Sequence, residues 1–200
     1  MRPALVLASG SPRRRELLTA LGLSFVVRPP EVDESRLAGE APEAYVDRLA
    51  LAKARAAARP GELALGADTI VWIDGQLLAK PGDTAEARRM LALLAGREHT
   101  VLTAVALHEP ATGREAVGRE RSRVRMAAMS AEEIAWYAAT GEPLDKAGAY
   151  AVQGLGALFV EAVDGNYTNV VGLPLPLTYR LFRELGYDLR RFLPPLSSRT

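Results

Sequence analysis

The sequence lacks cysteine, which excludes a disulfide framework and any chemistry that depends on a thiolate. Its charges nearly cancel, with a formal net charge of +1, so no general basic field exists and nucleic acid is not an expected partner. No apolar run approaches the length of a membrane span, and residues 1–3 lead straight into an apolar segment rather than a secretory pattern. We therefore expect a cytoplasmic protein without a membrane partner.

Lysine and the side-chain amides are also scarce. Of 25 basic residues, only Lys53, Lys80 and Lys146 are lysines. A lysine offers a compact, rotatable charge that the planar guanidinium of arginine does not reproduce. A lysine kept in an arginine-rich chain is therefore a candidate site residue, and so are the rare amides Gln153 and Asn169. Chance survival is the alternative explanation for each of them.

The length of 200 residues fits one domain or one domain with two lobes, and a hydrophobic content of 48% is enough for a large core. Strands and helices alternate irregularly, which favours a mixed α/β sheet over a regular Rossmann arrangement. The patterns predict strands at 4–8, 25–27, 63–67, 70–73, 99–108, 115–126 and 157–163. They predict helices at 13–22, 42–59, 84–95, 130–139 and from 174 or 176 to 185.

Local signals add detail to this outline. Asp68-Thr69 is expected to interrupt two apolar strands, Asp74-Gly75 to form a hairpin turn, and Thr84 to cap a helix. Ser130 to Glu133 has the form of a capping box. Residues 141–156 are expected to be irregular, and those after Gly186 to form a weakly ordered tail in which Phe192 is a docking candidate.

The segment that follows the first strand has the features of a phosphate-binding loop. Ser9, Gly10 and Ser11 break the strand, and Arg13 and Arg14 then open a helix. Unpaired N–H groups and partial positive charge already occupy a helix N-terminus, so cations placed there call for an anion. A phosphate approaching through the small-residue loop fits this need, and a solvated basic helix end is the alternative.

Two acidic segments could supply ligands for a metal. Asp68 interrupts apolar sequence, where a carboxylate is costly unless it is paired or binds a metal. Glu34, with Glu31 and Asp33 beside it, adds further carboxylate oxygens. Few histidines and no cysteine favour Mg²⁺ or Mn²⁺ over zinc. Together with the cationic loops, these residues fit metal-assisted phosphoryl chemistry, and solvated acidic turns are the alternative.

Seven segments occur in order along residues 4–186. They are ASGSPRRREL (8–17), EVDES (31–35), LALAKARA (49–56), LGADTIV (65–71), AKPGD (79–83), GREHTVLTAV (96–105) and LDKAGAYAVQGLGALFVEAVDGNYTNVVGLP (144–174). Together they resemble the Maf family, the nucleoside-triphosphate pyrophosphatases once described as septum-formation inhibitors. The segment GAYAVQ resembles the branch of that family that acts on dTTP and UTP.

The resemblance implies hydrolysis between the α- and β-phosphates, giving a nucleoside monophosphate and pyrophosphate. Asp68 matches the family's catalytic proton acceptor, with Glu34 as its partner in holding a divalent cation, Mg²⁺ or Mn²⁺. The substrate-selecting positions match Arg13, Thr69 and Gln153. The phosphate-binding positions match Ser9, Ser11, Arg14, Lys53 and Lys80.

The implied fold is a mixed, elongated and twisted sheet with flanking helices and two lobes around a central cleft, as in inosine-triphosphate pyrophosphatases. Residues 1–186 would form this single domain and 187–200 a C-terminal tail. A small-molecule nucleotide is the implied partner, and a homodimer is a family-level expectation. The rival reading is a nucleotide-binding regulator of cell division that need not turn its nucleotide over.

Overall fold

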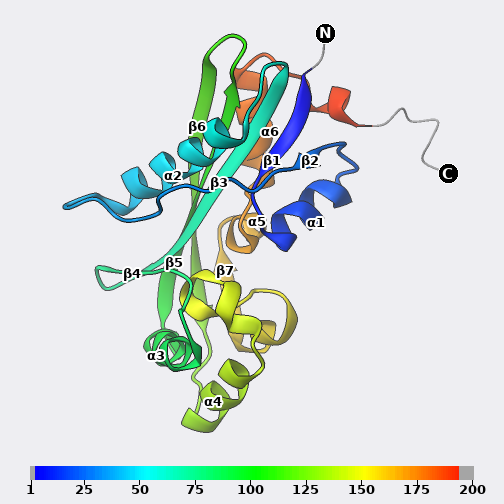
Figure 1. The fold of residues 1–200 in the computed structure, drawn as a ribbon. Helices are drawn as coiled ribbons and strands as arrows, with labels where there is room; N and C mark the ends of the chain where they lie inside the picture. Colours follow the sequence, from blue (N-terminus) through cyan, green and yellow to red (C-terminus); the bar gives the residue numbers. More distant parts are fainter. Residues whose placement is uncertain (1–2, 194–200) are drawn as a thin grey trace, which may run out of the picture. The chain divides into compact units, whose positions relative to one another are not determined.

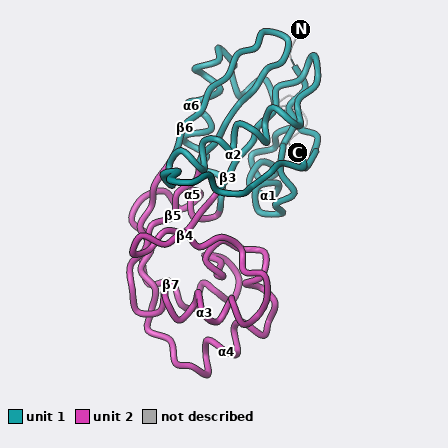
Figure 2. Tube along the Cα trace, turned by 60° about the vertical axis from the view of Figure 1, so that its left-hand side comes forward, with its two compact units in different colours: residues 1–68, 104–119, 172–200 teal, residues 69–103, 120–171 magenta. Residues whose placement is uncertain are grey.

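The computed structural model describes residues 3–193 of the chain. They form two compact units, coloured separately in Figure 2. Unit 1 takes the chain up to Asp68, then Ala104–Arg119, and then the described residues from Gly172 onward. Unit 2 takes Thr69–Thr103 and Glu120–Val171. No helix in the described part of the chain is both long and apolar enough to cross a bilayer.

Seven strands form one open sheet in the order β2-β1-β3-β5-β6-β7, with β4 paired to β3 beside this path (Figure 1). β1 pairs in parallel with β2 and β3, while the pairs β3–β4 and β6–β7 are antiparallel. The strands are β1 Ala4–Ala8, β2 Val26–Val27, β3 Glu62–Ile73, β4 Gln76–Leu78, β5 Glu98–Glu109, β6 Arg114–Met126 and β7 Val160–Asp164. The mixed α/β architecture expected from the sequence is confirmed.

Unit 1 buries an apolar core between its strands and three α-helices. The helices are α1 Pro12–Ala20, α2 Pro42–Ala57 and α6 Leu175–Glu184, followed by the 3-10 turn η4 Leu189–Phe192. The core consists mainly of leucines, with an alanine, a valine and a phenylalanine: Leu5, Leu7, Leu18, Leu63, Leu65, Ala67, Val105, Leu107, Leu173, Leu177, Leu181 and Phe182. Phe192 docks on this core, edge to face with Phe182, as the sequence predicted. Residues 194–200 of the expected tail lie outside the described part of the chain.

Unit 2 has its own core, packed around α3 and α4. Its helices are α3 Thr84–Leu94, α4 Ala131–Ala139 and α5 Tyr167–Val171, with 3-10 turns η1 Glu142–Asp145, η2 Ala147–Ala149 and η3 Gly154–Phe159. The helix α3 contacts both α4 and η2. The main buried residues are Val71, Ile73, Leu78, Met90, Leu91, Leu94, Val101, Val124, Met126, Ile134, Tyr137, Tyr150 and Phe159.

Two local predictions are confirmed in detail. Asp74 and Gly75 both have positive φ, at 47° and 78°, which is the conformation of the two-residue turn that joins β3 to β4. Ser130 and Glu133 form the expected capping box at the start of α4.

Other local predictions are wrong for identifiable reasons. β3 runs unbroken through Asp68 and Thr69, because the carboxylate of Asp68 is paired inside the unit with the ammonium of Lys53. α3 is capped by Asp83 rather than Thr84, since the Asp83 carboxylate accepts the N–H of Glu86 at 2.7 Å.

The region around residues 157–171 also differs from the expectation. Residues 157–159 belong to the 3-10 turn η3, and the strand begins only at Val160. The helix α5 was not predicted, because its five residues span little more than one turn and carry no readable periodicity.

Candidate functional site

The loop after β1 is held together by serine hydroxyls and a buried arginine. The N–H of Ser11 donates to Ser9 Oγ at 3.2 Å, and Ser11 is the N-cap of α1. The guanidinium of Arg14 is buried and donates to Ser9 Oγ at 3.1 Å. It also donates to the carbonyl of Ala67 at 2.9 Å and to that of Gly172 at 2.8 Å. This arginine therefore fixes the loop against the middle of β3, the strand that pairs with β1.

Burial lowers the pKa of Arg14, and the carboxylate of Asp68 acts in the opposite direction. Nearby Arg13 lies in the first turn of α1 and is only half-buried. That turn contains no acidic residue. The first turn of α1 thus places positive charge beside the serine loop, as a site for an anion requires.

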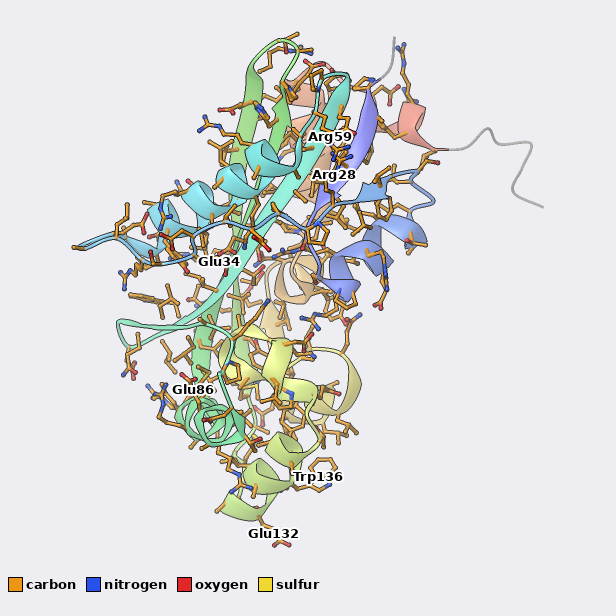
Figure 3. All side chains as sticks on the ribbon, viewed as in Figure 1. Arg28, Glu34, Arg59, Glu86, Glu132 and Trp136 are labelled. Carbon is orange, nitrogen blue, oxygen red and sulfur yellow. The ribbon has the colours of Figure 1, made fainter. Side chains whose placement is uncertain are left out.

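The second part of the site is an ion-pair cluster centred on Lys53 of α2. Its ammonium lies 2.7 Å from Asp68 Oδ1 and 2.7 Å from Glu34 Oε1. Asp68 is 8% exposed, whereas the Glu34 side chain is 57% exposed. The backbone carbonyl of Glu34 accepts a hydrogen bond from the Tyr45 hydroxyl at 2.8 Å, which ties its loop to α2. One ammonium therefore draws together a buried and an exposed carboxylate, of which the exposed one, Glu34, is labelled in Figure 3.

Gly66 explains how α2 comes close enough for this contact. A Cβ at Gly66 would lie 2.2 Å from the carbonyl oxygen of Ala50 and 2.7 Å from the nitrogen of Ala54. Only glycine allows the helix to sit directly on β3 at that position. Asp68 lies two residues along the strand and so points to the same face as Gly66, toward the helix that carries Lys53.

Burial raises the pKa of the Asp68 carboxyl above its ordinary value, while the ammonium of Lys53 and the guanidinium of Arg14 act against that rise. A buried carboxyl with a raised pKa is a better proton acceptor than an exposed one. Asp68 is thus suited both to take a proton and to act as a hard oxygen ligand.

Thr69 belongs to unit 2 and enters a buried network there. Its hydroxyl lies 2.9 Å from the hydroxyl of Thr103, which itself donates to the carbonyl of Asn169 at 3.1 Å. Because Thr103 has one hydroxyl proton, Thr69 is the donor in their shared bond. The side-chain amide of Asn169 donates to Val101 O and to Ser122 Oγ. The rare Asn169 thus acts as a structural brace.

The remaining candidates, Lys80 and Gln153, are exposed residues of unit 2. The carbonyl of Ala79, next to Lys80, accepts the N–H of Gly148 at 3.1 Å, so these two loops of unit 2 are joined. Lys146 uses its ammonium locally, on the carbonyl of Glu142 at 2.7 Å and on Asp145 Oδ1 at 2.6 Å. Lys146 therefore holds its own turn together.

The structure thus brings together, within unit 1, the candidates Ser9, Ser11, Arg13, Arg14, Glu34, Lys53 and Asp68. Sequence reasoning missed Tyr137 and Glu142 of unit 2, which hold the backbone on both sides of Gln153. The closely spaced glycines 154 and 156 were the only sequence signal of that arrangement.

The sequence profile of the Maf-like protein family matches residues 4–185. A dTTP/UTP pyrophosphatase of Symbiobacterium thermophilum is 51% identical over 187 residues, 92% of this chain and 95% of its own length. One from Anaeromyxobacter dehalogenans strain 2CP-1 is 53% identical over 191 residues, 94% of this chain and 97% of its own. One from Moorella thermoacetica is 51% identical over 187 residues, covering 92% of this chain and 96% of the relative.

Proposed function

This chain belongs to the Maf-like protein family, and from that premise we propose that it hydrolyses dTTP and UTP to the nucleoside monophosphate and pyrophosphate. The observation that carries the proposal is the pairing of buried Asp68 and exposed Glu34 with one lysine ammonium. In the same unit, Arg14 joins the serine loop to the residue that precedes Asp68. A carboxylate centre and an anion-binding loop on one unit are the elements that phosphoanhydride hydrolysis requires.

The serine loop and the first turn of α1 are proposed to bind the phosphates. Ser9 and Ser11 offer hydroxyls and Arg14 offers positive charge, and Arg14 also keeps the loop in shape. We propose the same phosphate-binding role for Lys53 and, from the matching motif AKPGD alone, for Lys80. Negative charge grows on the leaving pyrophosphate during cleavage, so cations held against it stabilise the transition state more than the ground state.

Asp68 and Glu34 fit a divalent cation such as Mg²⁺ or Mn²⁺. Two carboxylates already converge on a single cationic group, and the described residues contain no cluster of three His, Cys, Asp or Glu side chains that could hold a metal alone. A site with two carboxylates suits Mg²⁺, which takes its other ligands from substrate phosphates and water. When bound, such a cation neutralises phosphate charge and makes water more acidic.

Asp68 is proposed to accept the proton of the attacking water. Its burial and raised pKa favour this role, and Lys53 holds the carboxylate in place at 2.7 Å. The exposed Glu34 is then the more accessible of the two carboxylates for the cation.

Base selection is assigned to Arg13, Thr69 and Gln153. The Gln153 side chain is exposed, and its amide can present one donor and one acceptor to the imide edge shared by uracil and thymine. Cytosine has an amino group in place of one carbonyl and reverses one of these positions. Mispairing a buried polar group costs about 1–3 kcal/mol, or roughly tenfold to hundredfold in kcat/KM.

The test is a panel of dTTP, UTP and CTP with Mg²⁺, followed by pyrophosphate release and by binding in parallel. We expect turnover of dTTP and UTP, with CTP a poorer substrate. Binding of dTTP without any release of pyrophosphate would instead favour a nucleotide-responsive regulator of cell division. We place this activity in the cytoplasm, and we propose a homodimer, which light scattering on the purified protein tests directly.

A further inference from the structure

The backbone around Gln153 is held on both sides by two side chains of unit 2. The Tyr137 hydroxyl accepts the N–H of Ala151 at 3.2 Å and donates to Glu142 Oε1 at 2.7 Å. The Glu142 carboxylate accepts the N–H of Leu155 at 3.0 Å and that of Gly156 at 2.9 Å. We name this hydrogen-bonded pair, Tyr137 and Glu142, the clamp. It fixes the chain before and after Gln153 through three backbone bonds.

Two glycines allow the backbone to come this close to the clamp. Gly154 has φ +67°, and a Cβ there would lie 2.5 Å from Glu142 Oε2. A Cβ at Gly156 would lie 2.4 Å from the Tyr137 hydroxyl and 2.4 Å from the carbonyl oxygen of Ala151. Any larger residue at either position would push the backbone away from the pair that binds it. The segment and the clamp are therefore fitted to each other.

The clamp itself rests on rigid parts of unit 2. Tyr137 is fully buried on α4, with its ring 5.7 Å from that of Phe159. The backbone carbonyl of Glu142 accepts the ammonium of Lys146 at 2.7 Å. Burial opposes ionisation of Glu142, but hydrogen bonds from the N–H groups of Gly156 and Leu155 and from the Tyr137 hydroxyl, together with the charge of Lys146, outweigh it, so its pKa lies below the ordinary value. The anchor is therefore a carboxylate at neutral pH, able to accept both backbone bonds.

The backbone on either side of Gln153 is tied, while its own side chain is exposed. The described residues show no side-chain cap from Gln153 to η3, although it occupies the N-cap position. A held backbone with a side chain left toward solvent is how a protein presents a recognition group with little loss of entropy on binding.

We propose that Tyr137 and Glu142 are positioning residues that set base selectivity by holding Gln153 in place for the pyrimidine. This inference rests on the proposed function, in which Gln153 reads the imide edge. Discrimination by hydrogen bonds depends on placing donor and acceptor accurately, whereas a poorly matched base gains little from that placement. Loosening the clamp should therefore lower kcat/KM for dTTP more than it lowers kcat/KM for CTP.

The test is a double-mutant cycle with Glu142→Gln, Gln153→Ala and the two combined. The glutamine side chain keeps one acceptor oxygen and loses the second. For each protein, kcat and KM are measured for dTTP and CTP, with thermal unfolding as a check of the fold. Glu132→Gln is the matched control, an exposed glutamate in the first turn of α4, labelled in Figure 3.

We expect Glu142→Gln to lower the dTTP-to-CTP ratio of kcat/KM about threefold to tenfold, mainly through KM for dTTP. In the Gln153→Ala background it should change the ratio no further, because it acts through Gln153. Tyr137→Phe keeps the ring and removes the hydroxyl, so it serves as a second variant if Glu142→Gln does not fold. It should lower the ratio without abolishing turnover.

The outcomes separate this inference from the proposed function. A wild-type protein without turnover, or without preference for dTTP over CTP, refutes the proposed function. A wild-type preference that Gln153→Ala removes but both clamp variants retain overturns the inference alone. Equal effects of Glu142→Gln with and without Gln153 also overturn it, because the clamp would then not act through that residue.

Discussion

Lowering the pH from 7 to 5 should destabilise unit 2 through one buried histidine. His99 is 3% exposed, and its Nε2 lies 2.7 Å from the Tyr150 hydroxyl. Its Nδ1 has no hydrogen-bond partner in the described part of the chain. Protonation would place a charged ring with an unsatisfied N–H in the interior, and burial accordingly lowers the pKa of His99 to about 4.

The sign and size of the effect follow from that value. In the unfolded chain the histidine binds its proton near pH 6.5, whereas the folded protein resists protonation until about pH 4. The stability is therefore fully present above pH 6.5 and is lost as the pH falls from 6.5 toward 4. A pKa difference of one unit between the folded and unfolded states changes the free energy of unfolding by about 1.4 kcal/mol. The free energy of unfolding therefore falls by about 2 kcal/mol between pH 7 and pH 5.

Urea unfolding at pH 7 and pH 5 measures this loss. Both tryptophans, Trp72 and Trp136, belong to unit 2, so their fluorescence reports on the unit that contains His99. The comparison is between the wild type, His99→Gln and the control His108→Gln, which changes the chain's other histidine. We expect the pH-dependent loss in the wild type and the control but not in His99→Gln. An unchanged loss in His99→Gln would refute the reasoning.

Three further predictions concern activity. Asp68→Asn should lower kcat by on the order of a hundredfold or more, measured as pyrophosphate release, while circular dichroism stays that of the wild type; half the wild-type rate would exclude Asp68 as a catalyst. Lys80→Arg should lose much of the activity although the charge is kept, because a guanidinium does not replace a compact ammonium; steady-state kinetics equal to the wild type would contradict this. Exhaustive EDTA treatment should stop turnover and Mg²⁺ should restore it, and an unchanged rate would exclude the metal.

The sequence predicted best those elements whose signals are local. The capping box at Ser130 and the turn at Asp74-Gly75 depend only on adjacent residues, and both appear as expected. The strand break at Asp68 was wrong because the compensating charge, Lys53, lies on a different element 15 residues away. A propensity argument assigns a buried carboxylate the free-energy cost of an unpaired charge, because the partner that offsets this cost is visible only in the fold.

The candidate site shows the same division. The scarcity of lysine selected Lys53 and the acidic loop selected Glu34, but the sharing of one ammonium by two carboxylates depends on the contact that Gly66 permits between α2 and β3. The clamp around Gln153 could not be predicted, because Tyr137 and Glu142 act on backbone N–H groups that any residue carries. Such contacts leave almost no trace in residue type, apart from the glycines that make room for them.

The bond between Arg14 and the carbonyl of Gly172 has a consequence for how the protein is made. Its two ends are 158 residues apart, so the ribosome finishes the acceptor long after the donor has emerged. At a synthesis rate of about 5–20 residues per second, the delay is roughly ten to thirty seconds. During that interval the arginine lacks one of the acceptors that hold it in the folded loop. A nascent chain therefore lacks this bond of the proposed phosphate-binding loop until translation is nearly complete.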